Sequence, residues 1–183
     1  ALLEKNIDFK LNSNALFGAI IRGRLDLVKK LISKGADINV SHPEFVSPLV
    51  SSIKFENMEI FEFLIKHHAI IDLQDEQGMT PLFFAIKQNN LDMINALIAN
   101  GANLQLTDNL GNTALIEAAM NGDILTFKLI LKNSSSVIDI KNKNSYYPAV
   151  LKFYLISTFI IHMIIYTRKV YNFPVKYHII LKK

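Results

Sequence analysis

Among the side chains of this 183-residue chain, the histidines show the pattern that most resembles a metal-binding or reactive site. His67 and His68 are adjacent and look like a pair of metal ligands, but neighbours on a helix do not share a face. No third ligand stands at a suitable spacing from them, and neither His42 nor His162 has an evident partner. We therefore predict no metal site.

Carboxylates and nucleophiles show no pattern that indicates catalysis. The acidic residues are scattered, and positions such as Asp26, Glu59 and Asp92 are expected to face solvent. The sequence has no Ser-His-Asp order, no Gly-rich phosphate loop and no Walker lysine. It contains no cysteine, which removes thiolate chemistry and fits a reducing compartment. We expect a cytoplasmic location, with delivery to the cytosol of another cell as the alternative. We predict no catalytic residue, no cofactor and no enzymatic activity.

The elements that carry these residues recur at a fixed period. An apolar residue followed by Asn, Asp or Gln appears at Ile38-Asn39, Ile71-Asp72, Leu104-Gln105, Ile138-Asp139 and Tyr171-Asn172. Successive spacings are 33, 33, 34 and 33 residues. Nine residues after the polar member of the first four pairs stand Pro48, Pro81, Ala114 and Pro148. A register kept over this length indicates a repeat protein.

Each unit reads as two short helices. In the stretch 78–103, the second helix has apolar residues at Leu91, Met93, Ile94, Leu97 and Ile98, the spacing of one helical face. The other units fill the same slots with Leu25, Leu27, Val28, Leu31 and Ile32; Met58, Ile60, Phe61, Leu64 and Ile65; and Ile124, Thr126, Phe127, Ile130 and Leu131. So short a helix pair cannot bury its apolar stripe alone, and the units must stack.

Local signals mark the ends of these helices. Ser47 and Thr80 precede a proline and are expected to cap the first helix of their units. Gly35 and Gly101 follow the second helix in the slot for a left-handed residue, and His68 occupies the same slot. The segments "DINVSH", "IDLQDEQG" and "LQLTDNLG" read as turns or short hairpins between units. We call these connections fingers.

The period and the pieces "GMTPLFFAI", "LVKKLISKGADIN" and "LGNTALIEAAMNGD" resemble ankyrin repeats. The resemblance covers Asn14 to Asp139 and implies an all-α, ankyrin-type helix-turn-helix solenoid with short hairpin or turn fingers. The chain departs from the family pattern at its histidine slot, which is filled by Phe17, Val50, Phe83, Ile116 and Val150. Glu56 and Asn89 replace glycine at the turn between the helices.

We predict a single ankyrin-repeat domain over 1–183. It divides into a partial repeat at 1–13, repeats at 14–40, 41–73, 74–106 and 107–140, and a degenerate terminal repeat with a basic tail at 141–183.

The C-terminal segment differs in composition from the rest. All 16 acidic residues lie at or before Asp139, and eight basic residues follow from Lys141 onward. Its uncharged stretch, 153–166, is 14 residues long and shorter than the roughly 20 that a bilayer requires. The register favours a fifth helix pair, expected over about 148–155 and 158–167. The alternatives are a membrane-contacting surface and a degenerated end.

The resemblance implies a non-catalytic module that binds another protein on the concave face of the solenoid. It implies no small-molecule substrate, and binding to nucleic acid is not expected. The alternative is a membrane-surface protein that uses the apolar, basic segment 149–183. By the family's pattern, the contact slots are Pro43, Glu44, Val46, Lys54 and Phe55; Glu76, Gln77, Met79, Lys87 and Gln88; and Asn109, Leu110, Asn112, Met120 and Asn121.

Overall fold

The computed structural model describes residues 13–133. Over this range the chain consists of helices, turns and two isolated β-bridges, with no strand, so the all-α fold class is confirmed. The helices are α1 (Ser13–Ile21), α2 (Leu25–Ser33), α3 (Pro48–Lys54), α4 (Met58–Lys66), α5 (Pro81–Lys87), α6 (Leu91–Ala99), α7 (Ala114–Met120) and α8 (Ile124–Asn133). None of these helices is long and apolar enough to cross a bilayer. The predicted partial repeat, the fifth helix pair and the tail lie outside the described residues.

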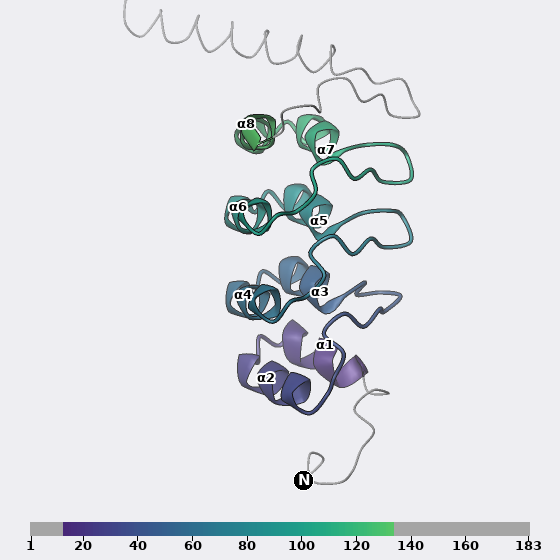
Figure 1. Cartoon of the computed structure of the whole chain (residues 1–183), viewed down its shortest axis with the longest axis vertical. Coiled ribbons are helices and arrows are strands. Elements are labelled where there is room, and N and C mark those ends of the chain that lie inside the picture. The colour runs from purple at the N-terminus through teal and green to yellow at the C-terminus, as the bar shows by residue number, and fades with distance from the viewer. Residues whose placement is uncertain (1–12, 134–183) are drawn as a thin grey trace, which may run out of the picture.

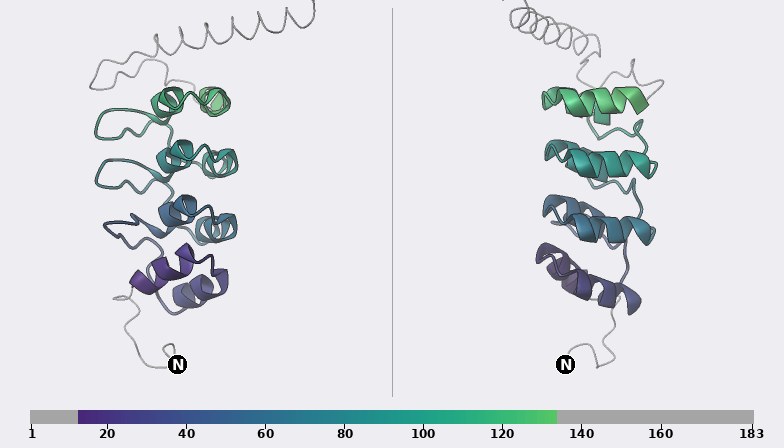
Figure 2. Two further views of the ribbon diagram at one scale, coloured as in Figure 1. Left: turned by 180° about the vertical axis from the view of Figure 1, so that it is seen from behind. Right: turned by 90° about the vertical axis from the view of Figure 1, so that its left-hand side faces the viewer.

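The helices stack in two columns (Figure 1). The first helices α1, α3, α5 and α7 form one column and pack on one another in chain order, while each also packs against the second helix of its own pair. The second helices α2, α4, α6 and α8 form the other column, and the fingers project on the opposite side of the first helices (Figure 2). One side of the stack is therefore built from fingers and first helices alone.

Helix starts follow the capping prediction in part. Ser47 Oγ accepts a hydrogen bond from the Val50 N–H at 3.2 Å and caps α3 as predicted. The prediction for Thr80 is wrong, because its side chain makes no capping bond. The N–H of Phe83, which the cap would have satisfied, donates instead to the Thr80 carbonyl at 3.0 Å.

Left-handed residues close the helices at the predicted slots. His68 has φ 63° and Gly101 has φ 86°, so the histidine does take the position after the second helix. Glu56 and Asn89 have φ 55° and 53° at the turns between helices. A left-handed conformation costs a residue other than glycine about 1–2 kcal/mol, and asparagine tolerates it better than glutamate. Strain is therefore stored in the turn at Glu56.

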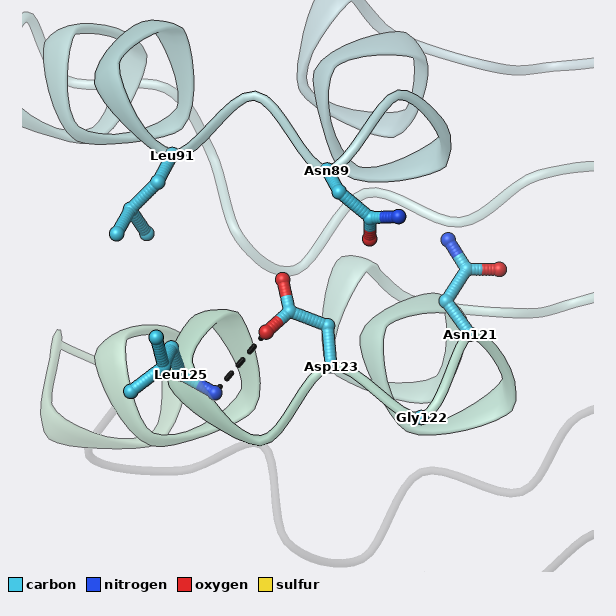
Figure 3. A pocket seen from close by; sticks show the side chains of 6 residues that line it. All are labelled: Asn89, Leu91, Asn121, Gly122, Asp123 and Leu125. Atoms are coloured by element: carbon cyan, nitrogen blue, oxygen red, sulfur yellow. Dashed lines mark hydrogen bonds between the residues drawn. The ribbon is translucent and has the colours of Figure 1, made fainter.

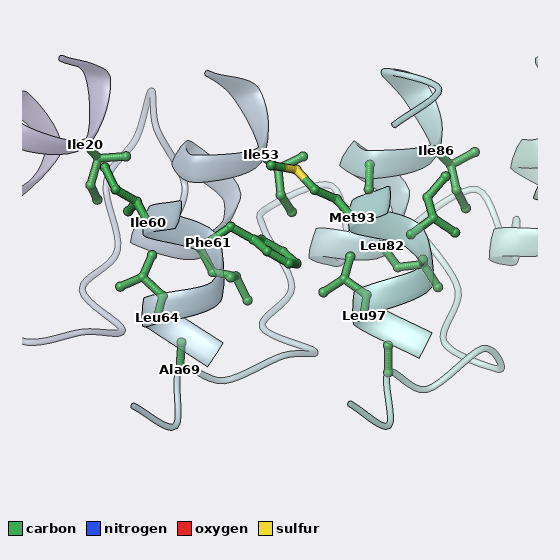
Figure 4. Close-up of a cluster of buried hydrophobic side chains, with 14 of the residues drawn as sticks. Ile20, Ile53, Ile60, Phe61, Leu64, Ala69, Leu82, Ile86, Met93 and Leu97 are labelled. Carbon is green, nitrogen blue, oxygen red and sulfur yellow. The ribbon is translucent and has the colours of Figure 1, made fainter. Parts of the chain in front are cut away.

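The core is the apolar stripe of the second helices packed against the first helices (Figure 4). Met93, Ile94 and Leu97 of α6 are fully buried, and the same three slots are buried in α4 and α8, whereas in α2 the first of them, Leu27, is half-buried. The stripe is narrower than predicted, because its flanking slots, such as Leu91 and Ile98, remain partly exposed. These slots lie at the edges of the helical face, where the neighbouring column no longer covers them.

One slot of the buried stripe holds a polar residue. Thr126 of α8 is fully buried, and within the described part of the chain its Oγ1 has no hydrogen-bond partner. A buried hydroxyl left unpaired costs about 1–3 kcal/mol relative to a satisfied one. The fourth pair is for this reason less stable than its apolar pattern suggests.

Candidate partner-binding surface

The second and third fingers share one hydrogen-bond design. In the second finger the Asp75 N–H donates to the Met79 carbonyl at 3.0 Å, and Asp75 Oδ1 accepts from the N–H groups of Gln77 and Met79 at 2.9 and 2.8 Å. In the third finger Asp108 Oδ1 accepts from the Leu110 and Asn112 N–H groups at 2.9 and 2.8 Å. An aspartate side chain thus organises the turn at each tip.

The first finger reaches a similar turn with different residues. His42 replaces the aspartate, and its Nδ1 accepts from the N–H groups of Glu44 and Phe45 at 3.1 and 3.3 Å. Phe45 stands where the other fingers have a left-handed glycine, and the left-handed conformation moves to Val46, with φ 67°. A β-branched residue is strained there. In exchange, the Phe45 ring stacks on Phe17, with centroids 5.5 Å apart.

Neighbouring fingers are joined by hydrogen bonds. Asn109 of the third finger donates through its backbone N–H to the Gln77 carbonyl at 2.8 Å, and through Nδ2 to the Glu76 carbonyl at 2.9 Å. Gln74 Nε2 donates to the carbonyls of Gly78 and Thr107 at 2.6 and 3.0 Å. The tips of the second and third fingers are consequently held at a fixed distance from each other.

The C-terminal ends of the first helices are cross-linked in the same manner. Gln88 Nε2 donates to the Lys54 carbonyl at 3.1 Å, and Asn121 Nδ2 donates to the Ile86 carbonyl at 3.1 Å. Lys54 Nζ donates to the Glu44 carbonyl at 3.2 Å and lies 5.0 Å from the centroid of the Phe84 ring. Side chains from successive repeats thus tie the first-helix column together.

We call the surface formed by the finger tips 41–47, 74–80 and 107–113 and by α1, α3, α5 and α7 the finger face. The predicted contact residues that are exposed at this face and its edge are Pro43, Glu44, Phe55, Glu76, Gln77, Lys87, Gln88, Asn109, Leu110, Met120 and Asn121. Lys54, Val46 and Met79 are half-buried. Three large apolar side chains are prominent, since Phe55, Leu110 and Met120 are 40%, 54% and 62% exposed.

Asn112 is the predicted contact residue that is buried in the free chain. It is buried, and its Nδ2 donates to Asp108 Oδ2 at 2.9 Å. Its amide therefore braces the third finger from inside and is not available to a partner.

Glu117 of α7 is the residue of this face that the sequence prediction missed. It is 7% exposed, and Lys87 Nζ lies 3.9 Å from its Oε1. Burial raises the pKa of the Glu117 carboxyl, and the nearby Asp108 raises it further, while Lys87 lowers it by a smaller amount than burial does. The equivalent position in the other repeats is occupied by Gly18, Ser51 and Phe84. A single charged residue at a position that is otherwise uncharged is the signal by which the sequence indicates Glu117.

A hollow of about 330 Å³ opens between the helix turns of the third and fourth pairs (Figure 3). The Asp123 carboxylate borders it, but Oδ1 accepts from the N–H groups of Leu125 and Thr126 at 3.0 and 3.1 Å. That carboxylate is used as a helix cap. Residues 13–133 contain no group of three or more His, Asp or Glu side chains arranged to hold a metal ion.

Stacked helix pairs with finger loops define a helical-repeat solenoid, a class in which each repeat contacts only its neighbours. The family model described as "Ankyrin repeats (3 copies)" matches residues 16–108 and 49–144. Together these matches cover more than half of the chain, which therefore belongs to the ankyrin-repeat family. No curated protein matches the chain. Ankyrin repeats generally act as protein–protein interaction modules and are typically non-catalytic.

Proposed function

We propose that this chain is a non-catalytic module that binds a partner protein on the finger face, the concave side of the solenoid. The observation that carries the proposal is the combination of exposed apolar side chains with finger tips that are bonded to each other. Leu110 projects from a finger whose neighbour Asn109 holds the second finger through two hydrogen bonds.

Such an arrangement favours binding because the ordering of the surface is completed during folding. A loop that must be fixed on association makes the binding free energy less favourable by about 0.5–1.5 kcal/mol for each side chain that is immobilised. The inter-finger bonds reduce that contribution. Large apolar anchors near the centre of an interface then supply most of the binding free energy. Met120 and Leu110 are the large apolar side chains of the finger face that are more than half exposed, and we assign them this anchoring role.

We further propose a location for the chain in the cytoplasm. A chain without cysteine suits the cytoplasm, where its partner would also be found. Membrane contact through 149–183 stays a prediction, because that segment lies outside the described residues.

Site-specific photo-crosslinking of the full chain tests this proposal. A benzophenone amino acid is placed at Leu110 or Met120, and at Leu125 of α8 as a matched control that is 66% exposed. In an extract of cells that express the chain, we expect one discrete adduct from the first two positions and none from Leu125. Adducts at Leu125 alone, or equal labelling at all three positions, would contradict binding at the finger face.

A further inference from the structure

The finger face carries an excess of negative charge. Within the described finger tips and first helices the acidic residues are Glu44, Asp75, Glu76, Asp108 and Glu117. The same elements contain two lysines, Lys54 and Lys87. Lys54 is engaged by the Glu44 carbonyl and the Phe84 ring. The part of the finger face that the third and fourth repeats form is therefore more acidic than the part that the first two form. Its single lysine is Lys87, which donates to no carbonyl among the described residues.

Glu117 lies within this acidic part and is poorly satisfied. Its side chain is 9% exposed, and among residues 13–133 no donor hydrogen-bonds to its carboxylate. Lys87 Nζ, at 3.9 Å, is too distant for a hydrogen bond, and it lies 3.1 Å from Met79 Sδ instead. Lys87 is therefore an ion-pair partner of Glu117 but not a hydrogen-bond donor to it, and a largely buried carboxylate with few of its roughly four acceptor positions filled is unfavourable.

We propose, on the basis of the proposed function, that the finger face binds a basic segment of its partner protein, with an arginine or lysine side chain donating to the Glu117 carboxylate. An arginine fits best, because its planar guanidinium can form two parallel bonds to one carboxylate. Met120 lies one helical turn after Glu117 on α7, so an apolar residue beside the basic one packs on Met120 and Leu110. The exposed Glu76 attracts the remaining positive charge of the segment.

The proposal also explains why a destabilising residue stands in this slot. In the free protein the buried Glu117 carboxylate is unfavourable, and Gly18, Ser51 and Phe84 show that other repeats fold without a charge there. A cation from the partner supplies the missing donors and removes the unfavourable term. Residues that lower the stability of the free protein and strengthen binding are common at functional sites.

The test uses randomised peptides displayed on phage and selected against the immobilised full chain. We expect the selected peptides to share an arginine or lysine next to an apolar residue. Their affinities are then measured for the full chain, for Glu117→Gln, and for Glu59→Gln, a control on the exposed side of α4. Glu117→Gln should weaken binding about tenfold or more, while Glu59→Gln leaves it unchanged. Replacing the basic peptide residue by norleucine should produce the same loss, and combining both changes should add little further loss.

The outcomes separate this inference from the proposed function. If peptide binding is lost in Leu110→Ser but unchanged in Glu117→Gln, the finger face binds protein and the basic-segment proposal is wrong. If neither substitution changes the affinity, both proposals are wrong. Carbodiimide coupling of the chain alone gives the remaining control, since a Glu117 cross-link to Lys176, Lys182 or Lys183 would show that the chain's own tail is the occupant. Unfolding cannot mimic the expected result, because Glu117→Gln should stabilise the free protein.

Discussion

Truncation of a core leucine tests the stacking arrangement on which the account rests. Leu97→Ala removes the branched end of a fully buried side chain in the centre of α6. At about 0.8 kcal/mol for each buried carbon, the lost transfer free energy is roughly 2.4 kcal/mol. The cavity between α5 and α6 adds to this value, so the free energy of unfolding should fall by about 2–5 kcal/mol in total.

Equilibrium urea unfolding followed by far-ultraviolet circular dichroism measures the effect. Asp92→Ala on the same helix is the matched control, because Asp92 is exposed and its removal should cost less than about 1 kcal/mol. The midpoint should shift for Leu97→Ala with little change in the slope of the transition. Equal losses for both variants would refute the assignment of the buried stripe.

Four further variants address individual positions. Thr126→Val should raise the free energy of unfolding by about 1–2 kcal/mol, because it replaces a buried unpaired hydroxyl by a methyl group, and a loss of stability in the same urea assay would show that the hydroxyl is satisfied. Glu56→Gly should stabilise by about 0.5–1 kcal/mol and Asn89→Gly by less, since both residues have positive φ and asparagine tolerates it better; a reversed order in thermal unfolding would contradict this. Glu117→Gln should stabilise the free chain at pH 7. Because burial raises the pKa of Glu117 in the folded state, the wild type is relatively most stable below the unfolded pKa of about 4.3 and loses that stability as pH rises through the folded pKa. The advantage of the glutamine variant should therefore vanish in acid, and a gain that is independent of pH would contradict this explanation.

Most of the fold could be predicted from the sequence because the repeat shows each local signal more than once. The register of Ile38, Ile71 and Leu104 gave the period, and the apolar slots gave the face of each second helix. The sequence could not predict which of two nearby acceptors, a side-chain hydroxyl or a backbone carbonyl, receives the hydrogen bond of an N–H in the first helical turn. Thr80 and Thr113 stand in the same slot, yet only Thr113 Oγ1 accepts a capping bond, from the Ile116 N–H at 3.4 Å.

The candidate surface was predicted less completely. Its slots follow from the repeat pattern, but burial within a finger depends on side-chain bonds that the pattern does not specify. Asn112 occupies the slot of Met79, and its amide turns inward because Asp108 can accept from it. Glu117 was missed because the resemblance assigns contacts to exposed slots, whereas this side chain gains its significance from being buried without a donor.

The central claim is that the finger face, and not the second-helix side, recognises the partner. The most direct measurement is the affinity of the cross-linked partner, once purified, for two matched double variants of the full chain. Leu110→Ser with Met120→Ser removes the apolar anchors of the finger face, and Ile124→Ser with Leu125→Ser removes two exposed apolar residues of α8. We predict that the first pair weakens binding about tenfold or more and that the second leaves it unchanged. A loss confined to the α8 pair would contradict the account.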